Sequence, residues 1–509
     1  MIVDLGDPAR AGGDLVESAD VCVIGSGGGG AVAAAELAEG GRSVVVLEQG
    51  PYWTGADMTQ REDEMLPRLF EEAGMRQTRG GAITILQGRS VGGSSVHNLC
   101  YAFRTPPAIL RLWREEHGLV ELSDASLEPS FARVEAGLGV VAIREDEVNE
   151  LNRRIRAGTR ALGYSGLVTR HNRRGCVQAG YCLLGCSYGA KQSVLVTYVP
   201  RADAAGARIY AGARCERIER EAGRVKRVIG HALGRDGEVR GRVAVDARVV
   251  VLAAGAVASP DLLQRSGIGG PAVGRHLHLH PSVLLAGFWD DAFHAYRGIP
   301  QSWYVDEFID LERDPHSGVV LMPVSGFPVL TAVNLPGFGR EHFALMRDYA
   351  RMGGLLALLH DRSEGSVRSG DSLARPEIRY ALDEADRRQL GDGVRHCAEV
   401  LFASGARRVV VPYTDGPLVL HSPREIRALD ARPVREGTVP LASTHPQSTC
   451  RMGVDPLTSV TNAWGECHDT AGLFVADMSV FPTSLGAPPQ ITTAALADRS
   501  ARHILARFG

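Results

Sequence analysis

The sequence lacks several features that would assign the protein to a class directly. No apolar run approaches the roughly 20 residues needed to span a bilayer, and the opening residues MIVDLGDPARAGGD have neither the basic nor the apolar region of a signal peptide. The formal net charge is only −3, with acidic and basic residues mixed along the chain. The sequence therefore predicts a cytoplasmic protein with no membrane span and no attraction to nucleic acid or anionic membranes.

Internal repeats, low-complexity tracts and the haem-attachment pattern C-x-x-C-H are also absent. The nine cysteines are odd in number and mostly scattered, which does not fit a secreted disulfide framework. The chain does have length: 509 residues exceed what one hydrophobic core usually supports. Two domains, or one domain with a large elaboration, are expected.

A glycine-rich turn separates a predicted strand from a predicted helix near the N-terminus, where residues 21–50 read VCVIGSGGGGAVAAAELAEGGRSVVVLEQG. This strand, turn and helix context is typical of a dinucleotide-binding site. Gly25 is placed for the tight turn, Gly27 for the close approach of a pyrophosphate, and Gly30 for packing of helix on strand. Gly28 is placed with the cofactor-binding residues. The helix N-terminus would then face the phosphates.

Glu48 ends the second apolar strand of this unit, 18 residues beyond Gly30. A carboxylate at this position can bind both ribose hydroxyls, which argues against the 2′-phosphate of NADP. The unit alone does not distinguish FAD from NAD.

Four further segments resemble blocks of the glucose-methanol-choline (GMC) flavin oxidoreductases, and they occur in that family's order. They read GRSVGGSSVHNLCYAFR (88–104), VVLAAGAVASPDLLQRSGIG (250–269), THPQSTCRMG (444–453) and GLFVADMSVFPTSLGAPPQITTAALADRSA (472–501). The resemblance implies FAD as the cofactor and oxidation of an alcohol CH–OH group as the reaction.

The resemblance also implies an α/β fold with two domains. A discontinuous Rossmann-like FAD-binding domain would be assembled from residues 1–110, 190–285 and 436–509. An α+β substrate-binding domain with an antiparallel sheet would occupy residues 286–435, and residues 111–189 would form a connecting or cap segment.

The residue pattern of the middle segment agrees with this architecture. Residues 207–233, ARIYAGARCERIEREAGRVKRVIGHAL, alternate polar and apolar side chains on both sides of Gly223, as the strands of a hairpin do. RVVVLAAG (248–255) predicts a buried parallel strand whose end at Ala254 would pass the adenine half of the cofactor. Cys215, in the hairpin, is placed with the cofactor-binding residues.

His445, in THPQSTCRMG, matches the position of the family's active-site histidine. Alcohol oxidation by a flavin sends a hydride to flavin N5 and the hydroxyl proton to a base. Imidazole suits the base because its unperturbed pKa is about 6.5. Pro446 would hold His445 on extended, non-helical backbone.

The family's second active-site residue, a histidine or asparagine, is replaced here by Pro488, which cannot supply a side-chain hydrogen bond. Three alternatives stay open: His445 acts alone, a residue from elsewhere fills the gap, or the site is adapted to an unusual substrate. A non-redox reaction on the same scaffold, hydroxynitrile cleavage, is the alternative from another reaction class.

His97 lies in GGSSVHNLCYAF, which resembles the segment of choline oxidase whose histidine bonds covalently to the flavin. The two interpretations are a covalent link and a histidine packed beside the flavin ring. In either case the resemblance places several other residues at the cofactor: Gly92, Gly93, Ser94, Asn98, Asp477, Pro489 and Gln490.

Cys176, Cys182 and Cys186 are spaced C-x5-C-x3-C. Three thiolates suit a 3Fe-4S cluster, and some family members carry one on a similarly spaced triplet, whereas zinc normally needs four ligands. Packing cysteines and a disulfide are the alternatives. With a cluster, electrons would leave to an external acceptor; without one, oxygen is the alternative acceptor.

The substrate is less well defined. Residues 288–315 contain seven acidic residues and several aromatic ones, which could attract a cationic substrate or stack on a sugar ring, as in an amino sugar. The alternative interpretation of this run is a solvated surface.

Overall fold

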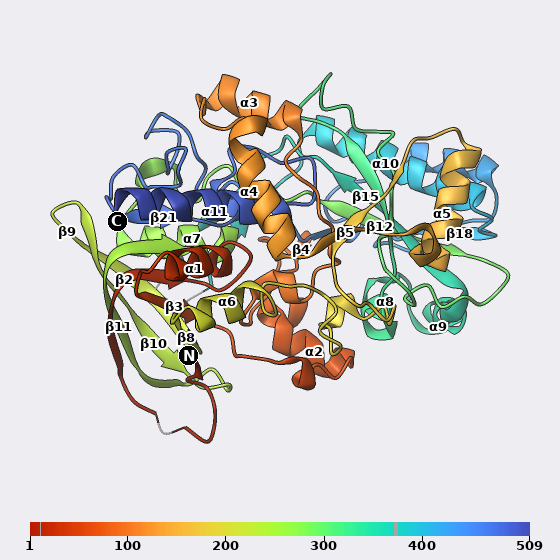
Figure 1. The fold of residues 1–509 in the computed structure, drawn as a ribbon. Coiled ribbons are helices and arrows are strands. Elements are labelled where there is room, and N and C mark those ends of the chain that lie inside the picture. The colour runs from red at the N-terminus through yellow and green to blue at the C-terminus, as the bar shows by residue number, and fades with distance from the viewer. Residues whose placement is uncertain (11, 371–374, 509) are drawn as a thin grey trace.

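Two β-sheets organise the chain, one toward each end of the molecule (Figure 1). The computed structural model describes residues 1–10, 12–370 and 375–508. Both chain termini lie beside the first sheet, and the middle of the chain builds the second (Figure 1). The α/β fold class predicted from the sequence is confirmed.

The first sheet has eight strands in the order β1-β8-β3-β2-β11-β10-β9, with β21 also paired to β11. The pairs formed among β1, β8, β3, β2, β11 and β21 are parallel, whereas β9, β10 and β11 pair antiparallel. The strands are β1 (Ile2–Asp4), β2 (Leu15–Ile24), β3 (Val44–Glu48), β8 (Arg208–Ala211), β9 (Ala213–Glu221), β10 (Arg224–Leu233), β11 (Val239–Leu252) and β21 (Leu473–Val475).

The predicted hairpin and buried strand are both present in this sheet. β9 and β10 pair around Gly223, whose φ of 76° lies in the region that favours glycine. The end of β11 is buried because it runs between β2 and β21. Such burial on both faces accounts for its continuous run of valines.

The second sheet has seven strands, with β14-β15-β12-β18-β19 as its main path and β20 linking β12 to β4. β12 begins at Ser282, so the expected domain division at 285/286 falls within a strand. β4 and β20 come from segments assigned by sequence to the FAD-binding domain. The strands are β4 (Ile83–Ile85), β12 (Ser282–Phe288), β14 (Val319–Val324), β15 (Met352–Leu359), β18 (Arg408–Val411), β19 (Leu418–Leu420) and β20 (Leu441–Ser443).

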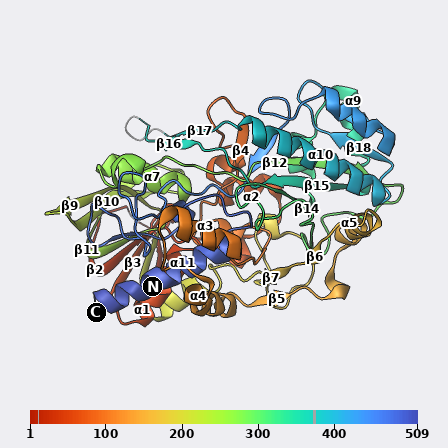
Figure 2. The same ribbon diagram turned by 90° about the horizontal axis from the view of Figure 1, so that it is seen from above.

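Helices cover both sheets. α1 and α11 pack together beside the first sheet, and α10 packs along β15 and β12 of the second (Figures 1 and 2). The helices are α1 (Gly30–Glu39), α2 (Glu62–Leu69), α3 (Pro107–His117), α4 (Asp124–Gly137), α5 (Glu150–Ala161), α6 (Tyr198–Ala204), α7 (Gly255–Ser266), α8 (Pro328–Asn334), α9 (Gly339–Arg347), α10 (Glu384–Ala403) and α11 (Gln490–Arg507).

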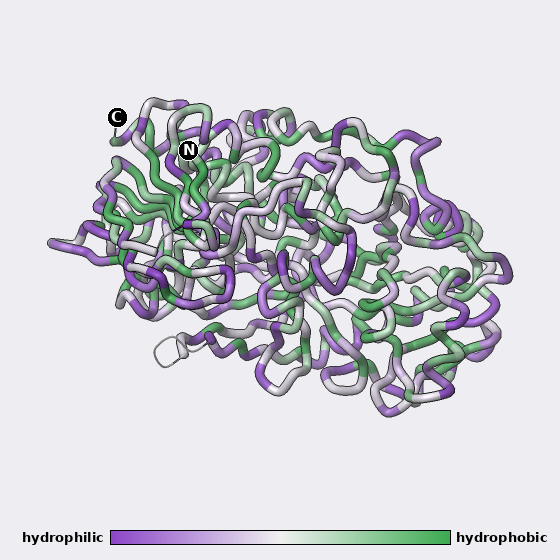
Figure 3. The backbone as a smooth tube through the Cα atoms, turned by 90° about the horizontal axis from the view of Figure 1, so that it is seen from below, coloured by the Kyte–Doolittle hydropathy of each residue, from purple (hydrophilic) through white to green (hydrophobic). Residues whose placement is uncertain are grey.

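Each sheet has its own hydrophobic core, one large apolar cluster around β2, β3 and β11 and another around β12, β15 and α10. Hydrophobic stretches of the backbone lie mainly inside the molecule, and many hydrophilic ones lie in loops at its outside (Figure 3). In the part of the chain that the structure describes, no helix combines the length and the apolar character needed to cross a bilayer.

Candidate active site

A cavity of about 1080 Å³ runs between the two sheets. It exceeds the roughly 300–1,000 Å³ of an ordinary small-molecule site, so it has room for a cofactor together with a substrate. Most of the residues assigned to the site from the sequence line it: Gly25, Gly27, Gly28, Glu48, Gly93, Ser94, His97, Asn98, Cys215, Ala254, His445, Asp477, Pro489 and Gln490.

The turn between β2 and α1 is tightly packed at two of its glycines and open at a third. A Cβ on Gly25 would lie 2.4 Å from the carbonyl oxygen of Ala253, and one on Gly30 would lie 2.0 Å from that of Gly25. A Cβ on Gly28 would meet no atom within 4 Å. Gly25 and Gly30 therefore hold the strand and helix together, while Gly28 leaves backbone accessible from the cavity.

Gly29 was not assigned to the site from the sequence, although it is packed more closely against its neighbours than Gly25 or Gly30. A Cβ there would lie 1.7 Å from the carbonyl oxygen of Ala476, just after β21. A run of four glycines is the only sequence signal, and it does not tell which of them meets a neighbour.

Glu48 lies at the end of β3 with its carboxylate already oriented. Oε2 accepts from the Ser26 amide (3.0 Å) and hydroxyl (2.7 Å), and Oε1 accepts from the Gly50 amide (2.8 Å). Burial raises the pKa of Glu48. A carboxylate offers about four acceptor sites, so one remains for a hydroxyl of a ribose.

The second glycine turn lies directly against the first. A Cβ on Gly93 would be 2.9 Å from the Cα of Gly27, and both Gly92 and Gly93 have positive φ. Ser94 Oγ accepts from the Gly88 amide at 2.8 Å. Gly92 itself lies outside the cavity lining and packs against Leu195, so its role is to shape the turn.

His97 is buried, with its ring 3.9 Å from that of Phe70, centroid to centroid. Burial and the nearby Lys191 ammonium lower the pKa of His97 to about 3, so the ring is neutral. Nε2 has no hydrogen-bond partner within the described chain. A buried, unpaired nitrogen in a cavity wall is a site that a bound group would complete.

The C-terminal segment reaches the same cavity through side-chain bonds. The Asn98 amide donates to Gln490 Oε1, and Gln490 Nε2 donates to Asn172 Oδ1 at 3.0 Å. Pro489 precedes Gln490 as the N-cap of α11. These contacts join three segments that are far apart in the chain.

Asp477 is bonded to the start of α7. Its Oδ2 accepts from the Gly255 amide (2.8 Å) and the Ser259 hydroxyl (2.5 Å), which also accepts from the Ala254 amide (3.2 Å). Asp477 thus fixes the helix N-terminus that faces the cavity. On the other side of the cavity, burial raises the pKa of Cys215 well above its usual value.

His445 lies in the cavity wall on non-helical backbone, just after β20, with Pro488 in the same lining. Its ring is open to the cavity but deep within the protein, and this burial lowers its pKa to about 4. His445 Nδ1 lies 3.2 Å from Nδ1 of His280, with the two rings nearly perpendicular. Nε2 is the ring nitrogen that His280 leaves free.

His280, which the sequence analysis did not single out, lies outside the cavity lining and contacts His445 from behind. The Gly486 amide donates to His280 Nε2 at 3.3 Å. One proton lies between the two Nδ1 atoms, and either His280 or His445 donates it. If His280 donates, a neutral His445 has its own proton on Nε2; if His445 donates, its Nε2 is free to accept a proton.

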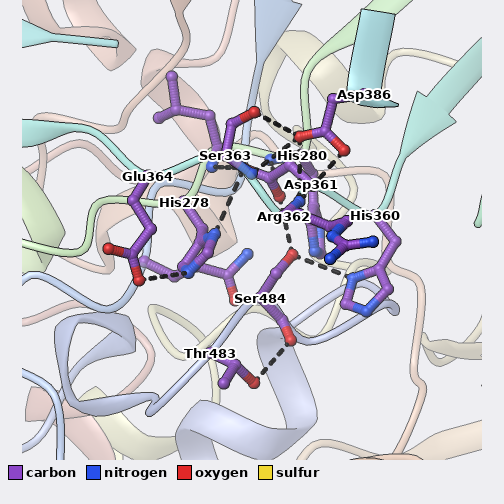
Figure 4. A network of polar contacts seen from close by, with 12 residues as sticks. His278, His280, His360, Asp361, Arg362, Ser363, Glu364, Asp386, Thr483 and Ser484 are labelled. Atoms are coloured by element: carbon purple, nitrogen blue, oxygen red, sulfur yellow. Dashed lines mark hydrogen bonds and ion pairs between the residues drawn. The ribbon is translucent and has the colours of Figure 1, made fainter. Parts of the chain in front are cut away.

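Asp361 holds the His280 backbone in place (Figure 4). Its carboxylate accepts from the amides of Leu279 (2.8 Å) and His280 (3.2 Å) and from the Ser484 hydroxyl (2.8 Å). His280 has a positive φ of 48°, which needs such support. The alternation His276-Leu277-His278-Leu279-His280 before a proline was the signal that could have drawn attention to it.

The three clustered cysteines do not form a metal site: no group of three metal-binding side chains lies close enough to hold an ion in the described part of the chain. The Cys182 thiol donates instead to the Cys100 sulfur, and this bond lowers the pKa of Cys100. Lys191, buried, donates to the Cys182 carbonyl at 3.1 Å. Cys176 packs in a small apolar cluster, and Cys186 donates its amide to a methionine sulfur. The residues present do not fit a 3Fe-4S cluster.

The acidic residues of the segment 288–315 do not line the cavity. Several pair with arginines at the surface, including Asp290 with Arg407 and Asp291 with Arg154. The cavity wall on this side is mainly apolar, with Ser282, Thr331 and Asn334 as polar members, and comes from five elements, β12, β14, α8, β15 and β18. It includes Leu284, Ala286, Met322, Val324, Leu330, Val333, Met352, Leu356, Leu358 and Val410.

Comparisons with known proteins identify the family of the chain. The family models for the N-terminal and C-terminal parts of GMC oxidoreductases match residues 66–282 and 361–497, and a model for an FAD-binding domain matches residues 20–59. An uncharacterized GMC-type oxidoreductase of Mycobacterium tuberculosis is 33% identical over 487 residues, 95% of this chain and 75% of that protein.

Two further proteins are similar. The long-chain-alcohol oxidase FAO4A of Arabidopsis thaliana is 28% identical over 94% of this chain and 67% of its own length. The crystal structure of pyridoxine 4-oxidase from Mesorbium loti superposes with a TM-score of 0.72 at 21% identity, over 95% of this chain and 98% of that one, and shows the shared fold. The chain belongs to the GMC oxidoreductase family.

Proposed function

We propose that this protein oxidises a primary alcohol with a long apolar chain to the aldehyde, with FAD as the hydride acceptor and His445 as the proton acceptor. The observation that carries the proposal is the continuity of one cavity, in which His445 and an extended apolar wall are both exposed. The similarity to a long-chain-alcohol oxidase supports the same substrate class.

The residues around the cavity fit FAD. Gly28 leaves backbone open to a pyrophosphate, Glu48 keeps acceptor capacity for a ribose, and His97 offers an unpaired Nε2. When bound, FAD would supply the acceptor for the hydride. We infer that His97 contacts the flavin through Nε2, either covalently or by a hydrogen bond. Yellow colour that stays with acid-precipitated protein, and is lost in His97→Ala, would identify the covalent form.

His445 would accept the hydroxyl proton at Nε2. This requires that His445 hold its own proton on Nδ1, so that His280 accepts at Nδ1 and carries its proton on Nε2. In this arrangement the Gly486 amide, 3.3 Å from His280 Nε2, makes no hydrogen bond to that nitrogen. The two histidines would therefore work as a pair that shares protons, with His445 facing the substrate.

Oxygen is the proposed acceptor of the electrons, because the related alcohol-acting proteins are named oxidases. The balanced reaction converts an alcohol and O₂ to an aldehyde and hydrogen peroxide. Peroxide formed in equal amount to aldehyde would support oxygen, whereas turnover that needs an added dye would support an external acceptor.

The substrate class is tested by kcat/KM for a series of unbranched primary alcohols. Each added methylene that enters the apolar wall contributes about 0.8 kcal/mol, so kcat/KM is expected to rise about fourfold per carbon until the wall is filled. A flat series, or better turnover of amino sugars than of any alkanol, would contradict the proposed substrate.

A further inference from the structure

Helices α8 and α9 carry an exposed apolar surface. Val329, Val333, Phe338 and Phe343 are 48%, 66%, 95% and 67% exposed, and they fall within fifteen consecutive residues. We call these four side chains the α8–α9 patch. Single exposed apolar residues need no explanation, but a group of large ones on neighbouring helices marks an interaction surface.

The patch lies on the outside of the wall that encloses the apolar part of the cavity. Leu330 and Val333 of α8 line the cavity, and Val333 is also part of the patch. Leu345 of α9 packs against Ala286 and Val410, which line the cavity from the second sheet. The two helices therefore separate the apolar cavity from solvent by a single layer. They lie at the edge of the molecule, at the lower right of Figure 1.

The charged residues of α9 are mainly positive, and the nearest acidic residue of α2, Glu62, is buried and accepts from the amides of Val329 and Leu330. Arg340 and Arg347 are exposed, and within the described chain neither forms an ion pair. Asp348 is neutralised by Arg408 at 2.5 Å, which leaves Glu341 as the acidic residue of α9. An apolar surface bordered by arginines suits a bilayer that contains anionic lipids.

We propose that the α8–α9 patch docks on a lipid bilayer containing anionic lipids, and that alcohol enters the cavity from the bilayer. The second half of this proposal rests on the proposed function, because a long-chain alcohol partitions into lipid rather than water. The docking itself rests on the exposed side chains and the arginines. The proposal departs from the expectation, drawn from the net charge of the whole chain, of no attraction to anionic membranes, because the arginines and apolar side chains are a local feature.

The test uses full-length, FAD-loaded protein and flotation with vesicles of phosphatidylcholine, alone or mixed with phosphatidylglycerol. The wild type should float with the mixed vesicles, and Phe338→Ser/Phe343→Ser should bind them at least about tenfold more weakly, because two aromatic anchors are lost. Arg340→Gln/Arg347→Gln should lose the preference for phosphatidylglycerol. Val120→Ser/Leu457→Ser, which removes two side chains each 72% exposed elsewhere, is the matched control and should bind as the wild type does.

Turnover distinguishes this proposal from the proposed function. With a short, water-soluble alcohol the Phe338→Ser/Phe343→Ser enzyme should match the wild type, and with a long-chain alcohol supplied in vesicles it should be slower. Equal flotation of the wild type and this variant would overturn the docking, as would wild-type dimers that dissociate in the variant, because a second copy would then be the occupant. Flotation of a protein that oxidises no alcohol would overturn the proposed function and leave the docking in place.

Discussion

At the scale of single residues, the proposed proton transfer depends on a histidine that is neutral well below neutral pH. Burial lowers the pKa of His445 to about 4. An imidazole accepts a proton only in its neutral form, and this form predominates above the pKa.

We therefore predict that kcat/KM rises with pH through about 4 and is level above it, where an unperturbed histidine would give a rise near 6.5. Steady-state kinetics from acid to neutral pH measure this rise in kcat/KM. The buffer ions should be varied as a control. A rise in kcat/KM near pH 6.5 would contradict the lowered pKa of a buried His445.

His280 is predicted to act as a positioning residue for His445. In His280→Gln the ring of His445 loses its Nδ1 partner, and kcat should fall about tenfold or more with little change in KM, because the substrate itself loses no contact. His276→Gln is the matched control, since His276 belongs to the same run but pairs with Glu364. Equal kcat in the two variants would remove His280 from the mechanism.

The sequence located His445 but not His280, for a physical reason. His445 lies in a local motif, whereas the contact of His280 with His445 joins residues 165 positions apart and depends on the packing of β12, β20 and the segment before α11. The sequence shows that Pro488, which lines the cavity, replaces the family's second polar residue. It does not show that His280 lies behind His445.

At the scale of elements, the turn between β2 and α1 combines two functions in adjacent glycines. Gly29 fits against the Ala476 carbonyl, while Gly28 faces open space. The order of strand, turn and helix was predictable because it is encoded locally. Which glycine serves packing was not, because Ala476 comes from the other end of the chain.

We predict opposite outcomes for alanine at these two positions. Gly29→Ala should lower the free energy of unfolding by about 1–3 kcal/mol, because the added methyl overlaps a backbone carbonyl. Gly28→Ala should leave stability nearly unchanged but weaken FAD binding, because the methyl occupies space in the cavity wall. Urea denaturation of the apoprotein and flavin fluorescence titration separate the two effects. The reverse pattern would contradict this assignment of the turn.

The cysteine segment shows the limit of spacing arguments. C-x5-C-x3-C brings three thiols near enough to influence one another electrostatically, but in the described chain no three metal-binding side chains lie close enough together to hold an ion. The contact that does form pairs Cys182 with Cys100, which the sequence did not associate with the triplet.

At the scale of the whole molecule, the cavity is built by both sheets. Glycines beside the first sheet and apolar side chains of the second face the same space, and β4 and β20, from the N-terminal and C-terminal segments, pair within the second sheet. The resemblance predicted the fold class and the cofactor domain. It did not predict that short strands from the N-terminal and C-terminal segments extend the second sheet. Three residues are too few to show the alternation of polar and apolar side chains that predicts a strand.

This arrangement predicts that FAD stabilises the whole chain. At 100 times its dissociation constant, FAD should add about 2.7 kcal/mol, and calorimetry should show one transition moving to higher temperature. ADP is a suitable control, since it fills only the nucleotide end. Two transitions, with one insensitive to FAD, would show that the sheets unfold independently.

The central claim is that an alcohol held against His445 transfers a hydride to FAD, and anaerobic mixing of the FAD-loaded protein with dodecanol tests it most directly. The flavin absorbance should bleach, and in His445→Ala the bleaching should slow by about 10²–10⁴-fold while the protein keeps its flavin. A flavin that stays oxidised with every alcohol, as in a hydroxynitrile-cleaving enzyme, or bleaching equally fast in the variant, would contradict the account.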